Sequence, residues 1–408
     1  MTAREYPVFT VTPKAERSLR AGHPWVYGEE VTAVAGAYEN GDMVDVVSNK
    51  GRYLGTGWVN DHSKIRVRII SRNTNDTFDE TFFRRRVRYA LDYRKTVMGE
   101  TDYRCCRLIF GEADQFPGLT VDRFENVLVA QVLSLGMERR KDWVYRALVE
   151  LLREDGEEID AIYERNDAAL RSLEGLEQGK GFYPMEGLRT DLDGHVTITE
   201  NGIKYDVDYI EGQKTGFFLD QKYNRQAAAK LARGRRVLDC FTHTGAFALN
   251  AAAAGAEHVT AVDVSAFALE LAAENGRRNG LTNLDYKCAD VFDLLTEMAN
   301  KKKCDYDYII LDPPAFTKSR ATAKNAYHGY KEINMKAMRL LPRGGYLATC
   351  SCSHFMTDEM FRKMLREAAA DAGVTLRQIE ARQQAPDHPI LPEVPETDYL
   401  KFYLLQVV

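Results

Sequence analysis

The C-terminal half of the chain alternates short apolar runs with segments of helical spacing. Apolar runs occupy residues 258–262, 307–311 and 345–350, and each one leads into polar residues. One predicted strand for each predicted helix indicates an α/β fold with a mostly parallel, doubly wound sheet. Ligands of such a sheet bind at the carboxyl ends of its strands. The polar residues that follow the runs are therefore candidate ligand contacts.

The stretch Arg235 to Ser265, RRVLDCFTHTGAFALNAAAAGAEHVTAVDVS, reads as a strand, a turn, an alanine-rich helix and a second strand. Asp263 ends the second strand roughly 20 residues past the turn, where such folds bind the hydroxyl pair of a ribose. Gly245 is the only glycine in the turn, so the G-x-G-x-x-G fingerprint that cradles a pyrophosphate is absent. The pattern favours S-adenosylmethionine (SAM), which has a ribose and no phosphates, over NAD. The competing interpretation is a nucleotide-free repeat in which Asp263 only caps a helix.

Polar residues also follow the later strands. A strand that ends near Cys288 is followed by Asp290 and Phe292, an acid and an aromatic ring that could hold adenine. Asp312-Pro313-Pro314 follows the next strand, and Ser351-Cys352-Ser353-His354 follows the one after it. All of these residues are expected at the same edge of the sheet.

The Asp-Pro-Pro and Ser-Cys-Ser motifs, together with GFFLDQKYNR (residues 216–225), resemble the bacterial large-subunit ribosomal RNA cytosine-C5 methyltransferases. The resemblance covers the whole chain. It implies a β-barrel PUA domain, a small α+β middle domain and a Rossmann-like class I methyltransferase domain whose last strand is antiparallel. It also implies SAM as cofactor and 23S ribosomal RNA as partner, before the subunit is fully assembled, and it allows a homodimer. The expected cofactor-binding residues, of which Phe218 and Gln221 rest on the resemblance, are Phe218, Gln221, Asp239, Phe241, Thr242, Thr244, Gly245, Asp263, Ser265, Asp290, Phe292 and Asp312.

Short β-patterned runs at 43–47, 53–59 and 64–71 predict the small N-terminal barrel. We place its boundary at residues 1–73, with the middle domain at 74–187 and the methyltransferase domain at 188–408. A helical pattern is expected from Asp79 to about Gly111. Asp220 either hydrogen-bonds a ligand or caps a helix that runs through Lys230, and both roles can hold at once. The basic residues of the first two domains either contact RNA or form a solvated surface; those expected on RNA are Lys64, Arg66, Arg68, Arg84 and Arg85.

Composition narrows the setting. The net charge of −5 gives no overall basic signal, so RNA binding would depend on local patches. No apolar stretch is long enough to span a membrane, and no secretory leader is recognisable. The seven cysteines have neither disulfide-framework nor zinc-site spacing, which indicates a cytoplasmic protein without a metal.

Cytosine C5 is not nucleophilic, so its methylation calls for covalent catalysis in which a thiolate first adds to C6. Cys352 is the expected nucleophile and Asp312 the group that contacts the ring, while Cys350 is expected to be structural. Another group of RNA cytosine-C5 methyltransferases has a second cysteine where this chain has Ala315, and many relatives have a lysine there. The base that removes the C5 proton is therefore not identified; its candidates are His354, Lys318 and the loop Asp387-His388-Pro389.

Two other functions compete. An N-methyltransferase that acts on an exocyclic base amine also suits Asp-Pro-Pro, although Phe316 stands one position late and Cys352 would have no role. A non-catalytic RNA assembly factor that keeps SAM as a structural ligand is the third possibility. Acids at every expected strand end argue against that last interpretation.

Overall fold

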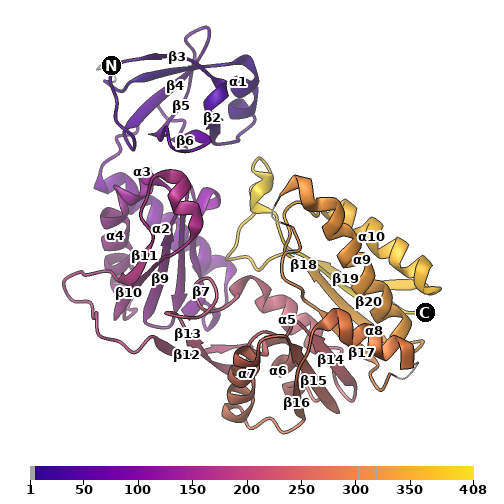
Figure 1. Ribbon diagram of the computed structural model, residues 1–408. Coiled ribbons are helices and arrows are strands. Elements are labelled where there is room, and N and C mark those ends of the chain that lie inside the picture. The colour runs from indigo at the N-terminus through magenta and orange to yellow at the C-terminus, as the bar shows by residue number, and fades with distance from the viewer. Residues whose placement is uncertain (1–4, 302–303, 318) are drawn as a thin grey trace. The chain divides into compact units, whose positions relative to one another are not determined.

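The computed structural model describes residues 5–301, 304–317 and 319–408 (Figure 1). These residues form two compact units, each assembled from three chain segments. The first unit takes the residues up to Thr197, Val207–Leu219 and Pro386–Thr397; the second takes Ile198–Asp206, Asp220–Ala385 and Asp398–Val408. Within the described ranges, no helix has both the length and the apolar character needed to cross a membrane.

The first unit begins with a six-stranded sheet in the order β2-β6-β5-β4-β1-β3. Its apolar core includes Phe9, Val46 and Val67, all fully buried. The alternation that predicted strands at 43–47, 53–59 and 64–71 is confirmed. The elements are β1 (Val8–Val11), α1 (Pro13–Arg20), β2 (Trp25–Tyr27), β3 (Val31–Ala35), β4 (Met43–Ser48), β5 (Tyr53–Val59) and β6 (Ile65–Ser71).

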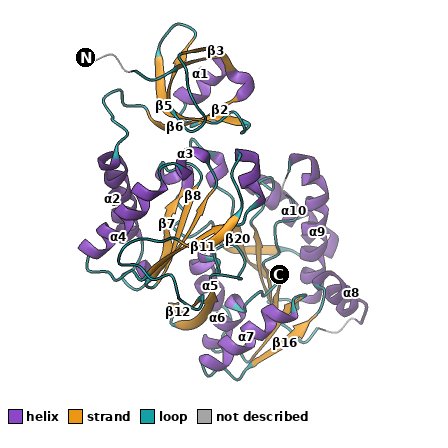
Figure 2. Ribbon diagram, turned by 60° about the vertical axis from the view of Figure 1, so that its left-hand side comes forward, coloured by secondary structure: helices purple, strands orange, loops and turns teal. Residues whose placement is uncertain are grey.

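A five-stranded sheet in the order β11-β10-β9-β8-β7 follows, and helices α2 and α4 lie side by side against it (Figure 2). The prediction of a helical pattern up to about Gly111 is wrong at its end, because α2 stops at Val97 and β7 begins at Cys105. The apolar residues at 105–110 fit both the helical and the strand periodicity. Hydrogen bonding to β8 makes this segment a strand. The elements are α2 (Glu80–Val97), β7 (Cys105–Phe110), β8 (Leu119–Phe124), β9 (Val127–Val132), α3 (Leu135–Glu138), α4 (Lys141–Glu154), β10 (Ala161–Asn166) and β11 (Gly179–Phe182).

The hairpin of β12 (His195–Glu200) and β13 (Ile203–Asp208) turns at Asn201 and Gly202, whose φ angles are 54° and 79°. Two positive φ angles are what a tight two-residue hairpin requires, so the Asn-Gly pair specifies the turn. Helix α5 (Lys222–Ala229) follows a short 3-10 turn, and Gln221 occupies its N-cap position. The alternative in which Asp220 caps this helix is wrong, because the N-cap lies one residue later. An Asp220 carboxylate oxygen accepts a hydrogen bond from the Tyr399 hydroxyl at 2.6 Å.

The second unit contains the predicted doubly wound sheet, in the order β16-β15-β14-β17-β18-β20-β19. β20 pairs antiparallel with both of its neighbours, which confirms the expected antiparallel last strand; β19, next to it, was not foreseen. The strands are β14 (Arg236–Cys240), β15 (His258–Asp263), β16 (Leu284–Cys288), β17 (Tyr308–Leu311), β18 (Tyr346–Ser351), β19 (Leu376–Arg382) and β20 (Lys401–Val407). The further helices are α6 (Ala246–Ala253), α7 (Ala266–Arg278), α8 (Val291–Lys301), α9 (Ala323–Leu340) and α10 (Asp358–Ala372).

Side-chain alternation along the strands divides the core of this sheet into two layers. Leu238 and Ile309 pack with helices α8, α9 and α10 on one face, whereas Val237 and Ile310 pack with α5 and α6 on the other. Both faces of the sheet are thereby covered by helices (Figure 1). The carboxyl ends of the parallel strands, with the polar residues that follow them, are left at one edge.

Candidate active site

The turn after β14 holds residues in an uncommon backbone conformation. Phe241 has φ 63° and His243 has φ 51°, both in the left-handed region that costs a non-glycine residue energy. Gly245 has φ 84°, and a Cβ there would lie 2.5 Å from Leu249 Cδ1 and 2.9 Å from Ala272 Cβ. The single glycine therefore allows both the turn and the close packing of α7 against α6. Such local strain is typical of a segment shaped to meet a ligand.

Asp263 orders this turn. Its Oδ2 accepts a hydrogen bond from the His243 backbone N–H at 2.9 Å, and its Oδ1 accepts one from the Ser265 N–H at 2.9 Å. Each carboxylate oxygen can accept further bonds, so a partly exposed Asp263 can also receive the two hydroxyls of a ribose. Ser265 caps α7, because its Oγ accepts from the Ala268 N–H at 3.2 Å.

Asp239, at the end of β14, is fully buried. Its Oδ2 accepts a hydrogen bond from Thr242 Oγ1 at 2.6 Å, while its Oδ1 has no hydrogen-bond partner among the described residues. Burial raises the pKa of Asp239 to about 7. An orphaned carboxylate oxygen in a buried position suits a cationic ligand group such as the α-ammonium of SAM. The residues at this end of β14 thus fit that cofactor, and Thr244 lies partly exposed in the same turn.

Asp290 and Phe292 follow β16, the neighbour of β15. Asp290 Oδ1 accepts a hydrogen bond from the Asp293 N–H at 3.1 Å and so orders the start of α8. The Phe292 ring belongs to an aromatic cluster centred on Phe316, with ring centroids 5.7 Å apart. Phe316 also contacts Phe241 at 6.5 Å and Tyr330 at 4.5 Å. Phe241 and Phe292 are therefore joined by a shared apolar surface beside the strand ends.

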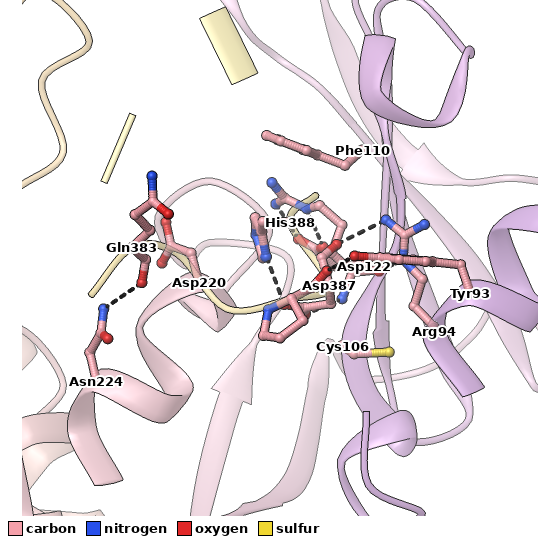
Figure 3. A network of polar contacts seen from close by, with 12 residues as sticks. Tyr93, Arg94, Cys106, Phe110, Asp122, Asp220, Asn224, Gln383, Asp387 and His388 are labelled. Carbon is pink, nitrogen blue, oxygen red and sulfur yellow. Dashed lines mark hydrogen bonds and ion pairs between the residues drawn. The ribbon is translucent and has the colours of Figure 1, made fainter. Parts of the chain in front are cut away.

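Asp312, Gln221 and Cys350 form a second polar group on the α5 face of the sheet. Gln221 Nε2 donates to Asp312 Oδ1 at 3.0 Å, and Gln221 Oε1 accepts from Asn224 Nδ2 at 2.7 Å. Asn224 is itself held by the Gln383 carbonyl at 3.1 Å (Figure 3). Burial, and then the neighbouring Asp220 carboxylate, raise the pKa of Asp312 to about 6, against the hydrogen bonds from Cys350 and Gln221.

The two cysteines at the end of β18 occupy different environments. Cys350 is fully buried, and burial followed by the nearby Asp312 carboxylate raises the pKa of its thiol well above the usual value. Cys352 stands one residue past the end of β18 and is partly exposed. A half-buried thiol at the end of a central strand is the more accessible of the two to a substrate.

Lys401 is a residue near this site that the sequence reading did not identify. It is 5% exposed and pairs across the sheet with Ser351. Its Nζ donates to the Ser353 carbonyl at 2.7 Å and to the Tyr399 carbonyl at 2.8 Å. The sequence contains one indication of this residue, because a lysine inside an apolar run such as YLKFYLLQV is unusual in a central strand.

The candidates for the proton-removing base have different positions. His354 is half-buried after β18, whereas Lys318 lies outside the described residues. Asp387 and His388 belong to the first unit and are 0% and 2% exposed.

The environment of the Asp387-His388 loop is structural. Asp387 Oδ2 accepts from the Arg107 N–H at 2.8 Å, and its carbonyl accepts from Arg94 at 2.9 Å. His388 Nδ1 lies 2.9 Å from Asp387 Oδ1, and the imidazole packs on Phe110 (Figure 3). These contacts identify the loop as a buried anchor in the first unit.

Phe218 also belongs to the first unit, where Lys214 Nζ lies 4.8 Å from the centre of its ring. Gln221 belongs to the second. The two residues expected on SAM by resemblance therefore stand in different compact units.

Most of the basic residues expected on RNA already pair with carboxylates. The ion pairs are Arg66 with Asp61, Arg68 with Glu174, Arg84 with Glu150 and Glu154, and Arg85 with Asp76. Lys64 is exposed and forms no ion pair with a described residue. Contact with RNA phosphates at the arginines would compete with these internal pairs.

A doubly wound sheet with one antiparallel strand, a strained turn after its first strand and acids after the next strands together define a class I SAM-dependent methyltransferase. Residues 185–405 match the S-adenosylmethionine-dependent methyltransferase family, and residues 9–72 match the PUA-like domain family. The chain is 42% identical, over 97% of its length and 98% of the relative's, to a protein of Shewanella denitrificans named ribosomal RNA large subunit methyltransferase I. The chain belongs to the ribosomal RNA large subunit methyltransferase I family, and its cofactor is SAM.

Solved structures agree on the fold. A SAM-dependent methyltransferase from Streptococcus mutans is similar with a TM-score of 0.81 and 22% identity, over 98% of this chain and 100% of that one. SMU.776, a methyltransferase complexed with SAH, is similar with a TM-score of 0.82 and 22% identity over the same shares. The fold is thus found in proteins of low sequence identity.

Proposed function

We propose that this protein methylates C5 of a cytosine in 23S ribosomal RNA, through a covalent adduct between Cys352 and C6 of the base. The name of the 42% identical relative, ribosomal RNA large subunit methyltransferase I, supports the RNA substrate. The observation that carries the chemistry is the contrast at the end of β18, where Cys350 is fully buried and Cys352 is partly exposed. An accessible thiol at this place has a role in C5 methylation and none in methylation of an amine.

The cofactor supplies a methyl group that its sulfonium already activates. Asp263 would hold the ribose hydroxyls, and Asp239 would face the ammonium of the methionine part. Phe241, Thr242, Thr244, Gly245 and Ser265 would shape the turn around it, with Gln221, Asp290, Phe292 and, by resemblance, Phe218 as further contacts.

The protein's own chemistry concerns the base. The Cys352 thiolate forms a bond to C6, and the electrons of the C5–C6 double bond make C5 nucleophilic. A carboxyl at Asp312 would stabilise the charge that develops at N3, and a pKa of about 6 lets it hold or accept a proton near neutral pH. After methylation a base removes the C5 proton, the double bond forms again, and the thiolate leaves. His354 and Lys318 stay candidates for that base, whereas the burial of Asp387 and His388 argues against them.

The test is a trapping experiment. RNA that contains 5-fluorocytosine should form a stable covalent complex with the wild-type protein and SAM, because fluorine cannot leave as a proton does. Cys352→Ser should form no complex and lose methyl transfer by several orders of magnitude, since a hydroxyl is hardly ionised at neutral pH. Cys350→Ser is the matched control and should keep most of its activity. Near-normal methyl transfer by Cys352→Ser would remove the covalent mechanism.

The N-methyltransferase alternative needs an aromatic ring that stacks on the base next to Asp-Pro-Pro. The nearest such ring, Phe316, packs 4.5 Å from Tyr330, which is fully buried. This packing favours a structural role for Phe316 and makes the alternative weaker. An RNA assembly factor without activity would fail the trapping test and still bind SAM.

We further propose the three-domain division 1–73, 74–187 and 188–408. The ends of the six-stranded sheet at Ser71 and of the five-stranded sheet at Phe182 support these boundaries. The first two domains would bind RNA through Lys64, Arg66, Arg68, Arg84 and Arg85. A cytoplasmic location follows from an RNA substrate of this kind, and the protein would act before the subunit is fully assembled, alone or as a homodimer.

A further inference from the structure

The reversed direction of β20 places its first residue at the site. The other six strands of the sheet run the same way, so their carboxyl ends share one edge. An antiparallel strand brings its amino end to that edge instead. Lys401 is the first residue of β20 and lies opposite Ser351, the last residue of β18. Cys352 is the next residue along the chain.

The Lys401 ammonium is buried, and it forms no ion pair with any residue that the structure describes. Its side chain is among the least exposed of the charged residues, and two of its three protons are donated to the Ser353 and Tyr399 carbonyls. Among the described residues, no carboxylate oxygen forms a salt bridge with its Nζ. A buried cation that has only carbonyl partners is costly, and an anion near it would lower that cost.

The Cys352 thiol lies near enough to Lys401 to supply such an anion when it ionises. Burial lowers the pKa of Lys401 to about 8, and among the groups that act the other way Cys352 comes first, ahead of Asp398 and Asp358. The attraction between two charges is mutual, so a thiolate that favours the ammonium is itself favoured by it. The hydrogen bond from Nζ to the Ser353 carbonyl fixes the ammonium within one peptide unit of Cys352.

We propose that Lys401 is a positioning residue that holds Cys352 in its thiolate form. The use of that thiolate in catalysis rests on the proposed function, whereas its ionisation is a property of the protein alone. Tyr330 and Cys350 also interact with the thiol, and both are neutral when it ionises because burial raises the pKa of each. Lys401 thus supplies positive charge at this end of β18.

The experiment measures the rate of alkylation by iodoacetamide at each cysteine of the full-length protein between pH 5 and pH 10, by mass spectrometry. Cys288 is exposed and lies at the far side of the sheet, so it serves as the control within the same molecule. In the wild type, the alkylation midpoint of Cys352 should lie below that of Cys288. In Lys401→Gln, which can still donate to both carbonyls, the midpoint of Cys352 should rise by at least about one pH unit, a roughly tenfold lower thiolate fraction at neutral pH.

Lys401→Arg keeps the charge and should keep a midpoint close to that of the wild type. An unchanged Cys352 midpoint in Lys401→Gln would overturn the proposal. A wild-type midpoint of Cys352 at or above that of Cys288 would overturn it as well, and this measurement needs no variant. Both readouts are independent of methyl transfer, so they stand apart from the trapping test of the proposed function.

Discussion

Asp239 and Asp263, at the ends of adjacent strands, differ in burial and in the hydrogen bonds that their carboxylates accept. Asp263 receives backbone N–H groups on both oxygens and is partly exposed, so its carboxylate is well solvated by the chain. Asp239 is fully buried and has one oxygen without a partner among the described residues. The backbone donors stabilise the Asp263 carboxylate without a ligand. The unpartnered oxygen of Asp239 would be stabilised by a hydrogen-bond donor or cation on a bound ligand.

Asp263→Ala should weaken the binding of the cofactor by about 1.5–3 kcal/mol, the loss typical of charge-assisted hydrogen bonds. It also removes the acceptors of the His243 and Ser265 N–H groups, so the turn itself should loosen. Calorimetry with S-adenosylhomocysteine measures the affinity. Asp285→Ala removes an exposed carboxylate of β16 and is the control that should bind normally. Unchanged affinity in Asp263→Ala would exclude this residue from the cofactor site.

Asp239→Asn should stabilise the cofactor-free protein in a pH-dependent way. The folded-state pKa of about 7 lies above the ordinary value of 3.8, so the folded protein holds this proton more tightly than the unfolded chain does. The free energy of unfolding of the wild type therefore falls as pH rises from about 4 to about 7, because folding then requires a buried Asp239 charge. Asparagine carries no charge, so the variant does not lose this contribution. In denaturant unfolding, the free energy of unfolding of Asp239→Asn minus that of the wild type should be about 1–3 kcal/mol larger at pH 8 than at pH 5. The same variant should bind the cofactor more weakly, and an equal gain at both pH values would contradict the assignment.

At the scale of elements, the local sequence pattern was sufficient to predict the strands whose ends form the candidate site. Asp263 ends a predicted strand, and Asp290 and Asp312 follow two others, because short apolar runs and the polar residues after them determine where those strands end. Lys401 was not predicted as a site residue, because only the pairing of β20 with β18 brings it to the strand ends. That pairing joins Ser351 to Lys401, 50 positions later in the sequence. The strand at 105–110 was missed for a similar reason, since hydrogen bonding to β8 decides between two periods that its short apolar run allows.

Strand β6 gives a test of RNA contact that compares two of its basic residues. Lys64→Gln, just before the strand, should weaken binding to a large-subunit ribosomal RNA fragment and reduce the slope of log affinity against log salt by about 0.7–0.9, one phosphate contact. Arg66→Gln should change the slope less, because Asp61 already pairs with this arginine at 2.7 Å. Binding at several salt concentrations measures both. A slope that Lys64→Gln leaves unaltered would remove this strand from the RNA interface.

At the scale of the whole molecule, the three-domain division stays a prediction, and the contacts group the described residues into two units that share the chain. The methyltransferase sheet, its antiparallel strand and the N-terminal sheet were all expected from the sequence or the resemblance. The passage of 207–219 and 386–397 into the first unit was not, because it depends on a few buried polar contacts. Arg94, fully buried, donates to the Asp387 carbonyl and to Asp114, and nothing in its local sequence distinguishes it from its solvated neighbours.

The segment 386–397 has a consequence for how the protein is made. The two units alternate along the chain in six segments, so the chain passes between them five times. A ribosome releases the chain from its N-terminus, and domains generally fold as units in that order. Here the first unit lacks one hydrogen-bond partner of the Arg94 side chain and of the Arg107 backbone N–H until residue 387 has emerged. Nascent chains of this protein should therefore stay sensitive to protease in the first unit until residue 387 has emerged, and a stop codon after residue 385 should lower the stability of that unit.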